Sequence, residues 1–217
     1  MPMFPLNSVV FPGMTLPLHV FEDRYRMLVS HLLTIEDPAE RVFGTVAIRE
    51  GYEVGDHGAQ SVYRVGCLLQ LTEAERQPDG TFAIIAVGRE RLVLDHMERG
   101  GDFPLGVANV VTEPAIEVPE EILHRARATF TAYRAAMVEL QGDPFSGALP
   151  RDPDYLGWTL SALAPLPMAE RQSLLEAENA TERLILVTRL LGNELRAINV
   201  IPSLPATQVA RTAWSPN

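Results

Sequence analysis

The sequence predicts an α+β fold in which a β-rich half precedes a helical half. Short apolar runs broken by proline, glycine and turn residues fill residues 1–117, a pattern typical of strands. From residue 118 to residue 200, apolar residues recur at three- and four-residue steps, which is typical of one face of a helix. We therefore predict a β-rich subdomain over 1–117, a helical subdomain over 118–200 and an extended or disordered tail over 201–217.

The first 35 residues predict strand, turn, strand and helix in that order. Pro5, Pro12 and Pro17 have no backbone donor, so strands that contain them lie at sheet edges or are broken by turns. The Pro12-Gly13 pair is the predicted reversal. After Phe21 the apolar period becomes helical, with its face formed by Tyr25, Leu28, Leu32 and Ile35.

Further strands are predicted over 41–48, 63–76, 81–94 and 103–112, which are rich in Val, Ile, Leu and Phe. Gln77-Pro78-Asp79-Gly80 predicts a hairpin turn, and Gly88 predicts a bulge inside the returning strand. Residues 50–59 contain three glycines without an apolar repeat and are predicted to form a surface loop.

Four helices are predicted in the second half of the chain. The first begins near Pro119, ends at Gly142-Asp143-Pro144 and carries an apolar stripe that needs a partner surface. The others are predicted over 155–164, 168–177 and 179–198. Asn179 and Glu182 form a capping box at the start of the last helix.

Several blocks carry a family resemblance: Phe-Pro-Leu (4–6), Val-Phe-Pro-Gly (10–13), Leu-Pro-Leu (16–18), Phe-Glu (21–22), Arg-Tyr (24–25), Phe-Gly-Thr-Val-Ala-Ile (43–48), Val-Gly-Cys (65–67), Val-Gly-Arg-Glu-Arg (87–91) and Pro-Met-Ala-Glu-Arg-Gln-Ser-Leu-Leu-Glu (167–176). They resemble the N-terminal domain of Lon protease, the ATP-dependent protease La, and the bacterial proteins that consist of that domain alone. Asp23 departs from the pattern, because the stand-alone members usually carry proline there.

The resemblance runs from residue 3 to about residue 198. It implies a PUA-like, mixed or antiparallel, barrel-like sheet followed by a helical bundle, with no cofactor. In the family this domain is thought to help recognise unfolded or tagged protein substrates. The expected partner is therefore such a polypeptide, with a separate protease or chaperone as a further partner.

The sequence contains no lysine, so all 18 residues in the Lys+Arg total are arginines. A phosphate-loop lysine, a serine-lysine dyad and a lysine Schiff base are therefore excluded. Full Lon proteases append an ATPase and a peptidase that use such lysines. We expect the 217-residue chain not to be an enzyme and to have neither ATPase nor peptidase activity.

Charge and composition limit the partners and the compartment. Residues 1–117 hold 17 acids and nine arginines, so this half should repel a polyanion and not bind nucleic acid. The single cysteine, Cys67, lies in an apolar run. We therefore expect it to be a buried core residue, and we expect the protein to occupy a reducing compartment. We see neither a signal peptide nor an apolar span, and we expect a cytoplasmic bacterial protein that does not bind membranes.

The titratable residues offer little support for metal binding or catalysis. The histidines His19, His31, His57, His96 and His124 never recur in a short ligand motif, so no metal site is predicted. Asp56-His57 and Asp95-His96 resemble fragments of a catalytic arrangement, but adjacent residues of a strand or loop should point in different directions. The alternative function is nevertheless a small-molecule-binding or hydrolytic enzyme with a pocket between the two subdomains.

Five apolar residues of the first segment are the candidate peptide-binding residues: Phe4, Phe11, Met14, Phe21 and Tyr25. By default such residues form the core. In the alternative they line a groove beside the proline-broken edge, to which an extended peptide adds as a strand. The leading hypothesis is therefore a non-enzymatic module that binds protein or peptide.

Overall fold

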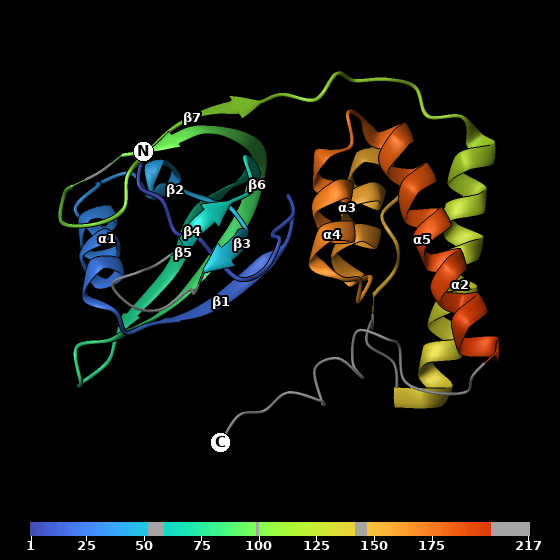
Figure 1. Cartoon of the computed structure of the whole chain (residues 1–217), viewed down its shortest axis with the longest axis horizontal. Coiled ribbons are helices and arrows are strands. Elements are labelled where there is room, and N and C mark those ends of the chain that lie inside the picture. The colour runs from blue at the N-terminus through green and yellow to red at the C-terminus, as the bar shows by residue number, and fades with distance from the viewer. Residues whose placement is uncertain (52–58, 99, 142–146, 201–217) are drawn as a thin grey trace. The chain divides into compact units, whose positions relative to one another are not determined.

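The computed structural model describes residues 1–51, 59–98, 100–141 and 147–200 (Figure 1). The chain forms two compact units, a β-rich unit (Met1–Thr112) and a helical unit (Glu113–Asn217), which confirms the predicted α+β fold. The boundary predicted at residue 117 lies in the segment between the last strand and the next helix. The predicted tail, 201–217, lies outside the described residues.

Antiparallel pairing organises the β-rich unit. A five-stranded sheet has the order β1-β6-β5-β2, with β7 also paired to β6, and β3 pairs with β4 in a separate ribbon. The described strands are β1 (Thr15–Val20), β2 (Val42–Thr45), β3 (Ile48–Gly51), β4 (Ala59–Val62), β5 (Val65–Arg76), β6 (Phe82–Met97) and β7 (Gly106–Val111). The strand β4 was not predicted, and most of the loop predicted over 50–59 lies outside the described residues.

Strand β6 is the centre of the sheet because three strands pair with it. One of its edges pairs with β5 along most of its length, and the other pairs first with β1 and then with β7. The change of partner occurs at Gly88, where the Gly88 N–H donates to the Met14 carbonyl at 2.9 Å. A register shift against β5 accompanies it, which confirms the bulge predicted at Gly88.

The segment before β1 differs from the predicted regular strand. Met3 and Leu6 form only isolated parallel bridges, to Gly44 and Ala47. Pro5 cannot donate a ladder hydrogen bond, which prevents regular pairing here. The predicted turn at Pro12-Gly13 is confirmed, with Gly13 at φ 80°.

Helix α1 (Asp23–Leu33) packs its apolar face into the core of the β-rich unit. The ring of Tyr25 stacks on that of Phe4 with centroids 3.9 Å apart. Core-facing residues of β1, β5 and β6 complete the cluster, including the predicted buried Cys67. The hairpin predicted at residues 77–80 is also confirmed, with Gly80 at φ 83°.

The helical unit contains α2 (Glu120–Gln141), α3 (Pro153–Leu163), α4 (Met168–Glu176) and α5 (Ala180–Val200). The predicted stripe of α2 buries Ala126, Phe130, Tyr133 and Met137, and its partner is α5, which also contacts α3 and α4. The Asn179 side chain accepts from the Glu182 N–H at 3.0 Å, as predicted for the cap. No helix in the described ranges is long and apolar enough to cross a membrane.

A buried cation lies at the centre of the helical unit. Arg183 of α5 is fully buried, and its guanidinium carbon lies 3.2 Å from the centre of the Trp158 ring. The same guanidinium donates to both carboxylate oxygens of Glu113, one at 3.1 Å, and to the carbonyls of Leu174 and Ala177. Its charge is therefore paired and its donors are used, which is what burial of an arginine requires.

Replacing Arg183 with Ala should lower the free energy of unfolding of the helical unit by about 3 to 5 kcal/mol, because it leaves a partly buried Glu113 carboxylate without its partner. Urea denaturation followed by tryptophan fluorescence measures this. Arg189→Ala, an exposed arginine of the same helix, is the control and should change the value by less than about 0.5 kcal/mol. Equal effects of the two substitutions would contradict a structural role for the buried ion pair.

Native Cys67 should not react with a thiol-specific disulfide reagent until the chain opens, because it is fully buried and burial raises the pKa of its thiol to about 12. The pKa of Cys67 in the folded chain lies above its ordinary value of 9.0. The stability that the buried neutral thiol contributes is therefore fully present below pH 9 and is lost as the pH rises toward 12. Absorbance of the released thiolate, with and without urea at pH 8, checks the first point. Rapid labelling of the folded chain would contradict it.

Candidate functional site

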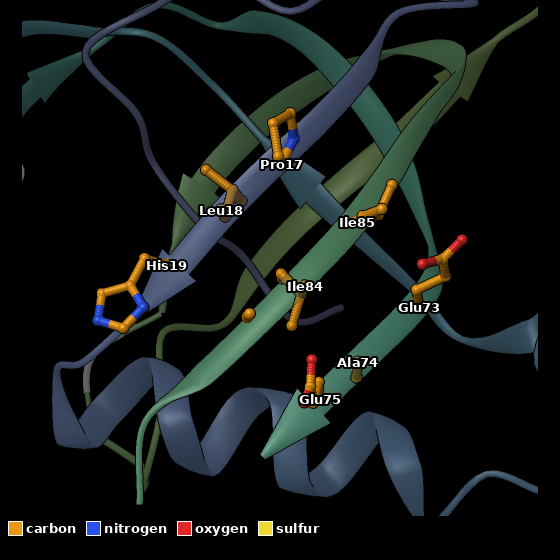
Figure 2. Close-up of a pocket in the computed structure, with 9 residues that line it drawn as sticks. Pro17, Leu18, His19, Glu73, Ala74, Glu75, Ile84 and Ile85 are labelled. Atoms are coloured by element: carbon orange, nitrogen blue, oxygen red, sulfur yellow. The ribbon is translucent and has the colours of Figure 1, made fainter. Parts of the chain in front are cut away.

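The candidate site is an open groove of about 500 Å³ on the β-rich unit. Figure 2 shows side chains from three neighbouring strands, β1, β6 and β5, around it. The lining residues are Pro17, Leu18, His19, Glu73, Ala74, Glu75, Ala83, Ile84 and Ile85. The groove thus lies on the sheet and not beside it.

Strand register sets the layout of the groove. Pro17 pairs with Ile85, which pairs with Glu73, so these three form one row across the strands. His19, Ala83 and Glu75 form the next row by the same pairing. Since alternate residues point to opposite faces, both rows face solvent while Leu18 and Ile84 between them face the core.

A register shift in β5 decides which acidic residues face the groove. Leu71 lies opposite Ala86 on the core face, and the next pair is Glu73 opposite Ile85, so Thr72 is an extra residue. The Thr72 hydroxyl donates to the Ile85 carbonyl at 3.0 Å. The bulge therefore places Glu73 and Glu75 on the solvent face.

The floor of the groove is apolar and is lowest where it is formed by a small residue, Ala83. Ala83 contributes only a methyl group, while Ile85 and Pro17 supply larger apolar surfaces beside it. Phe21, which follows β1, is 50% exposed, and its ring stacks on that of His19 with centroids 6.2 Å apart. The apolar surface therefore extends past the end of β1.

One wall of the groove is negatively charged. Within the described ranges, neither Glu73 nor Glu75 has an ion pair or side-chain hydrogen bond. In the nearby hairpin, the Asp79 carboxylate accepts from the Thr81 hydroxyl at 2.7 Å and from its N–H at 3.0 Å. These hydrogen bonds, with a smaller contribution from His19, hold the Asp79 pKa below its ordinary value, so this carboxylate stays ionised.

The free edge of β1 is a poor template for strand addition. The Met14 carbonyl faces β6, so the backbone groups of every second residue from there also face β6. The outer edge of β1 therefore presents the backbone groups of Thr15, Pro17 and His19, which face away from β6. Pro17 offers no N–H donor on this edge. Among the described strands, β1 pairs only with β6, and proline interrupts its outer edge.

The five peptide-binding candidates from the sequence lie in different environments. Phe4, Phe11 and Tyr25 are buried in the unit, and Met14 is half-buried against its core. Phe21 is the exposed member and adjoins the groove through His19. Sequence reasoning missed the groove residues Pro17, His19, Glu73, Glu75, Ala83 and Ile85, although the alternation in 71–76 and 82–87 contained the signal.

The acid–histidine pairs considered for catalysis have separate outcomes. Asp56 and His57 lie outside the described residues. The expectation that Asp95 and His96 point apart is wrong, because a register shift after Leu94 brings Asp95 Oδ2 within 3.1 Å of His96 Nδ1. Both side chains are exposed, and Arg64 lies 3.6 Å from Asp95. In the described ranges no cluster of three or more His, Cys, Asp or Glu could hold a metal ion.

Comparisons with known proteins match nearly the whole chain. The family model for the ATP-dependent protease La (LON) substrate-binding domain matches residues 1–193. Lon protease of Elusimicrobium minutum is 27% identical over 200 residues, which cover 89% of this chain and 23% of that protein. Lon protease of Escherichia coli is 24% identical over 203 residues, 92% of this chain and 25% of that protein. The chain thus spans about a quarter of the length of these relatives.

Solved structures show the same fold. A Lon N-terminal domain protein from Xanthomonas campestris has a TM-score of 0.63 at 23% identity and covers 88% of this chain and 96% of its own. The N-terminal domain of Lon protease from the Mycobacterium avium complex has a TM-score of 0.61 at 19% identity, with 88% and 97% covered. The fold predicted from the resemblance is confirmed, and the chain belongs to the family of ATP-dependent protease La (LON) substrate-binding domains.

Proposed function

We propose that the chain is a non-enzymatic module that binds unfolded or tagged polypeptide through the groove on β1, β6 and β5. The observation that carries this proposal is an open apolar groove on the solvent face of a sheet, extended by the exposed ring of Phe21. Grooves of this kind mark interaction surfaces. Membership of a family of substrate-binding domains supports the same assignment.

Binding at this groove should be weak and tolerant of sequence. Full burial of one large apolar side chain contributes about 1.5 to 3 kcal/mol, and ordering a disordered segment offsets part of that. Two such contacts correspond to dissociation constants of roughly 0.05 to 5 mM, before the cost of ordering weakens them. Such affinity suits transient capture before transfer to a separate protease or chaperone in the cytoplasm.

The proposal assigns the five sequence candidates different roles. Phe21 contacts the polypeptide, and Met14, Phe4, Phe11 and Tyr25 support the sheet from inside, since they are wholly or partly buried. Contact comes mainly from side chains on the sheet face, because Pro17 interrupts the edge that a full strand addition would use.

The alternatives have less support from the charges and the geometry. Acidic residues line the groove, which opposes nucleic-acid binding. An enzyme needs convergent polar groups in a site sheltered from water, whereas the Asp95–His96 pair is exposed on a strand.

Replacing Phe21 or Ile85 with Ser should weaken binding of a permanently unfolded, reduced and alkylated polypeptide about 10-fold each, since each loses roughly 1.5 kcal/mol of apolar contact. Fluorescence anisotropy of the labelled polypeptide with the full chain measures this. Val110→Ser on β7 is the matched control, because Val110 is 45% exposed in the same sheet. Equal weakening by the control, or no binding by the native chain, would refute the assignment.

An RNA oligomer should not bind, and affinity for the unfolded polypeptide should change less than about threefold between 50 and 300 mM salt, because apolar contact is weakly screened. The same anisotropy assay with a labelled single-stranded RNA tests this. Tight RNA binding that falls steeply with salt would reverse the choice of ligand class.

A further inference from the structure

We propose that the groove selects extended segments in which an apolar side chain is flanked, two residues away, by arginine or lysine. This inference rests on the proposed function and adds the chemical class of its ligand. It comes from the two groove rows and from the acidic wall beside them.

The spacing of the rows matches that of an extended peptide. Ala83 and Ile85 are two residues apart on β6, a separation of about 7 Å along a strand. A peptide laid along the groove turns every second side chain toward the sheet with the same period. One such side chain therefore lies over Ala83, where the floor is lowest, and the next lies over Ile85.

The second of these positions favours a long cationic side chain. Its aliphatic stem can lie on Ile85 and Pro17, and its charged end can extend to the next strand, where Glu73 pairs with Ile85. Neighbouring strands are about 4.8 Å apart, within reach of an arginine or lysine. Glu75 offers a second carboxylate beside Ala83.

The wall carries charge that the described part of the chain does not neutralise. Glu73 and Glu75 are exposed and lack ion-pair partners among the described residues, and Asp79 adds a third carboxylate near His19. The formal charge of the whole chain, −10, adds to the attraction for cations. Exposed ion pairs are individually weak, so this wall gives selectivity of a few-fold and the apolar floor gives most of the affinity.

Charge also argues against a second copy of this chain as the occupant. Two copies related by a two-fold axis would face each other through the same groove. Each copy carries a formal charge of −10, so two copies repel each other on approach. A cationic segment is therefore the complementary partner.

Three labelled peptides test the inference with the full chain. Each has one leucine in a serine background, and the positions two residues before and after the leucine are arginine, glutamine or glutamate. Anisotropy should rank them arginine, glutamine, glutamate, with the arginine peptide binding roughly 3- to 10-fold more tightly than the glutamine peptide. High salt should reduce that ratio.

A double substitution locates the selectivity. Glu73→Gln with Glu75→Gln should reduce the preference for arginine over glutamine to less than about twofold and leave the affinity for the glutamine peptide unchanged. Glu98→Gln with Asp102→Asn is the matched control, since it changes the net charge equally but lies past the other end of β6. This control should keep the preference.

The outcomes separate the inference from the proposed function. Equal affinity for the arginine and glutamate peptides, with the unfolded polypeptide still bound, overturns the inference alone. If the control variant also loses the preference for the arginine peptide over the glutamine peptide, the preference comes from net charge. That result also overturns the inference. Failure of both the peptides and the unfolded polypeptide to bind overturns the proposed function. Sedimentation that shows a dimer dissociated by the arginine peptide assigns the groove to a second copy and overturns the inference.

Discussion

The β-rich unit depends on a close backbone contact between the N-terminal segment and strand β6 at Gly88. A Cβ atom at this position would lie 2.3 Å from the Phe11 carbonyl oxygen, so only glycine allows the approach. Two hydrogen bonds hold it, from Gly88 N–H to Met14 and from Gly13 N–H to Gly88, both at 2.9 Å. Because β1 begins at the next residue, Thr15, this contact sets the register of β1 on β6. The groove rows follow from that register.

Register also determines how the sheet can meet another chain. A regular outer edge on β1 would invite indefinite strand pairing, which is a route to aggregation. Pro17 removes one donor from that edge, and its ring contributes apolar surface to the face. One residue therefore weakens recognition through the backbone and adds to recognition through side chains. Under the proposed function, contact through a face makes no demand on the backbone pairing of the ligand and leaves selection to its apolar and cationic side chains.

Local patterns predicted most elements but not the site. The strand pair 63–76 and 81–94, its hairpin and the four helices follow from periodicity, capping and turn residues within each segment. Periodicity also placed Tyr25 on the apolar face of α1, but its stacking on Phe4 joins two segments that the pattern treats separately. The acidic wall could not be predicted from the sequence, because Glu73 looks like any solvent-exposed strand residue. Only the extra residue Thr72 determines which face Glu73 lies on and that its partner is Ile85. Both depend on contacts distant in sequence, which a linear pattern does not contain.

The unpaired state of the wall has a physical cost that a ligand can offset. Glu73 and Glu75 are like charges about 7 Å apart on one face, which destabilises the strand slightly. Two arginines of the β-rich unit are engaged elsewhere, since Arg89 donates to Gln70 at 2.8 Å and Arg26 pairs with Asp23. Arg76 follows Glu75 directly but pairs with Phe82 and so lies on the opposite face of β5. A cation brought by a bound segment would relieve the repulsion, and under the proposal this relief contributes to the selectivity. This repulsion therefore supports the proposed preference for a cationic segment.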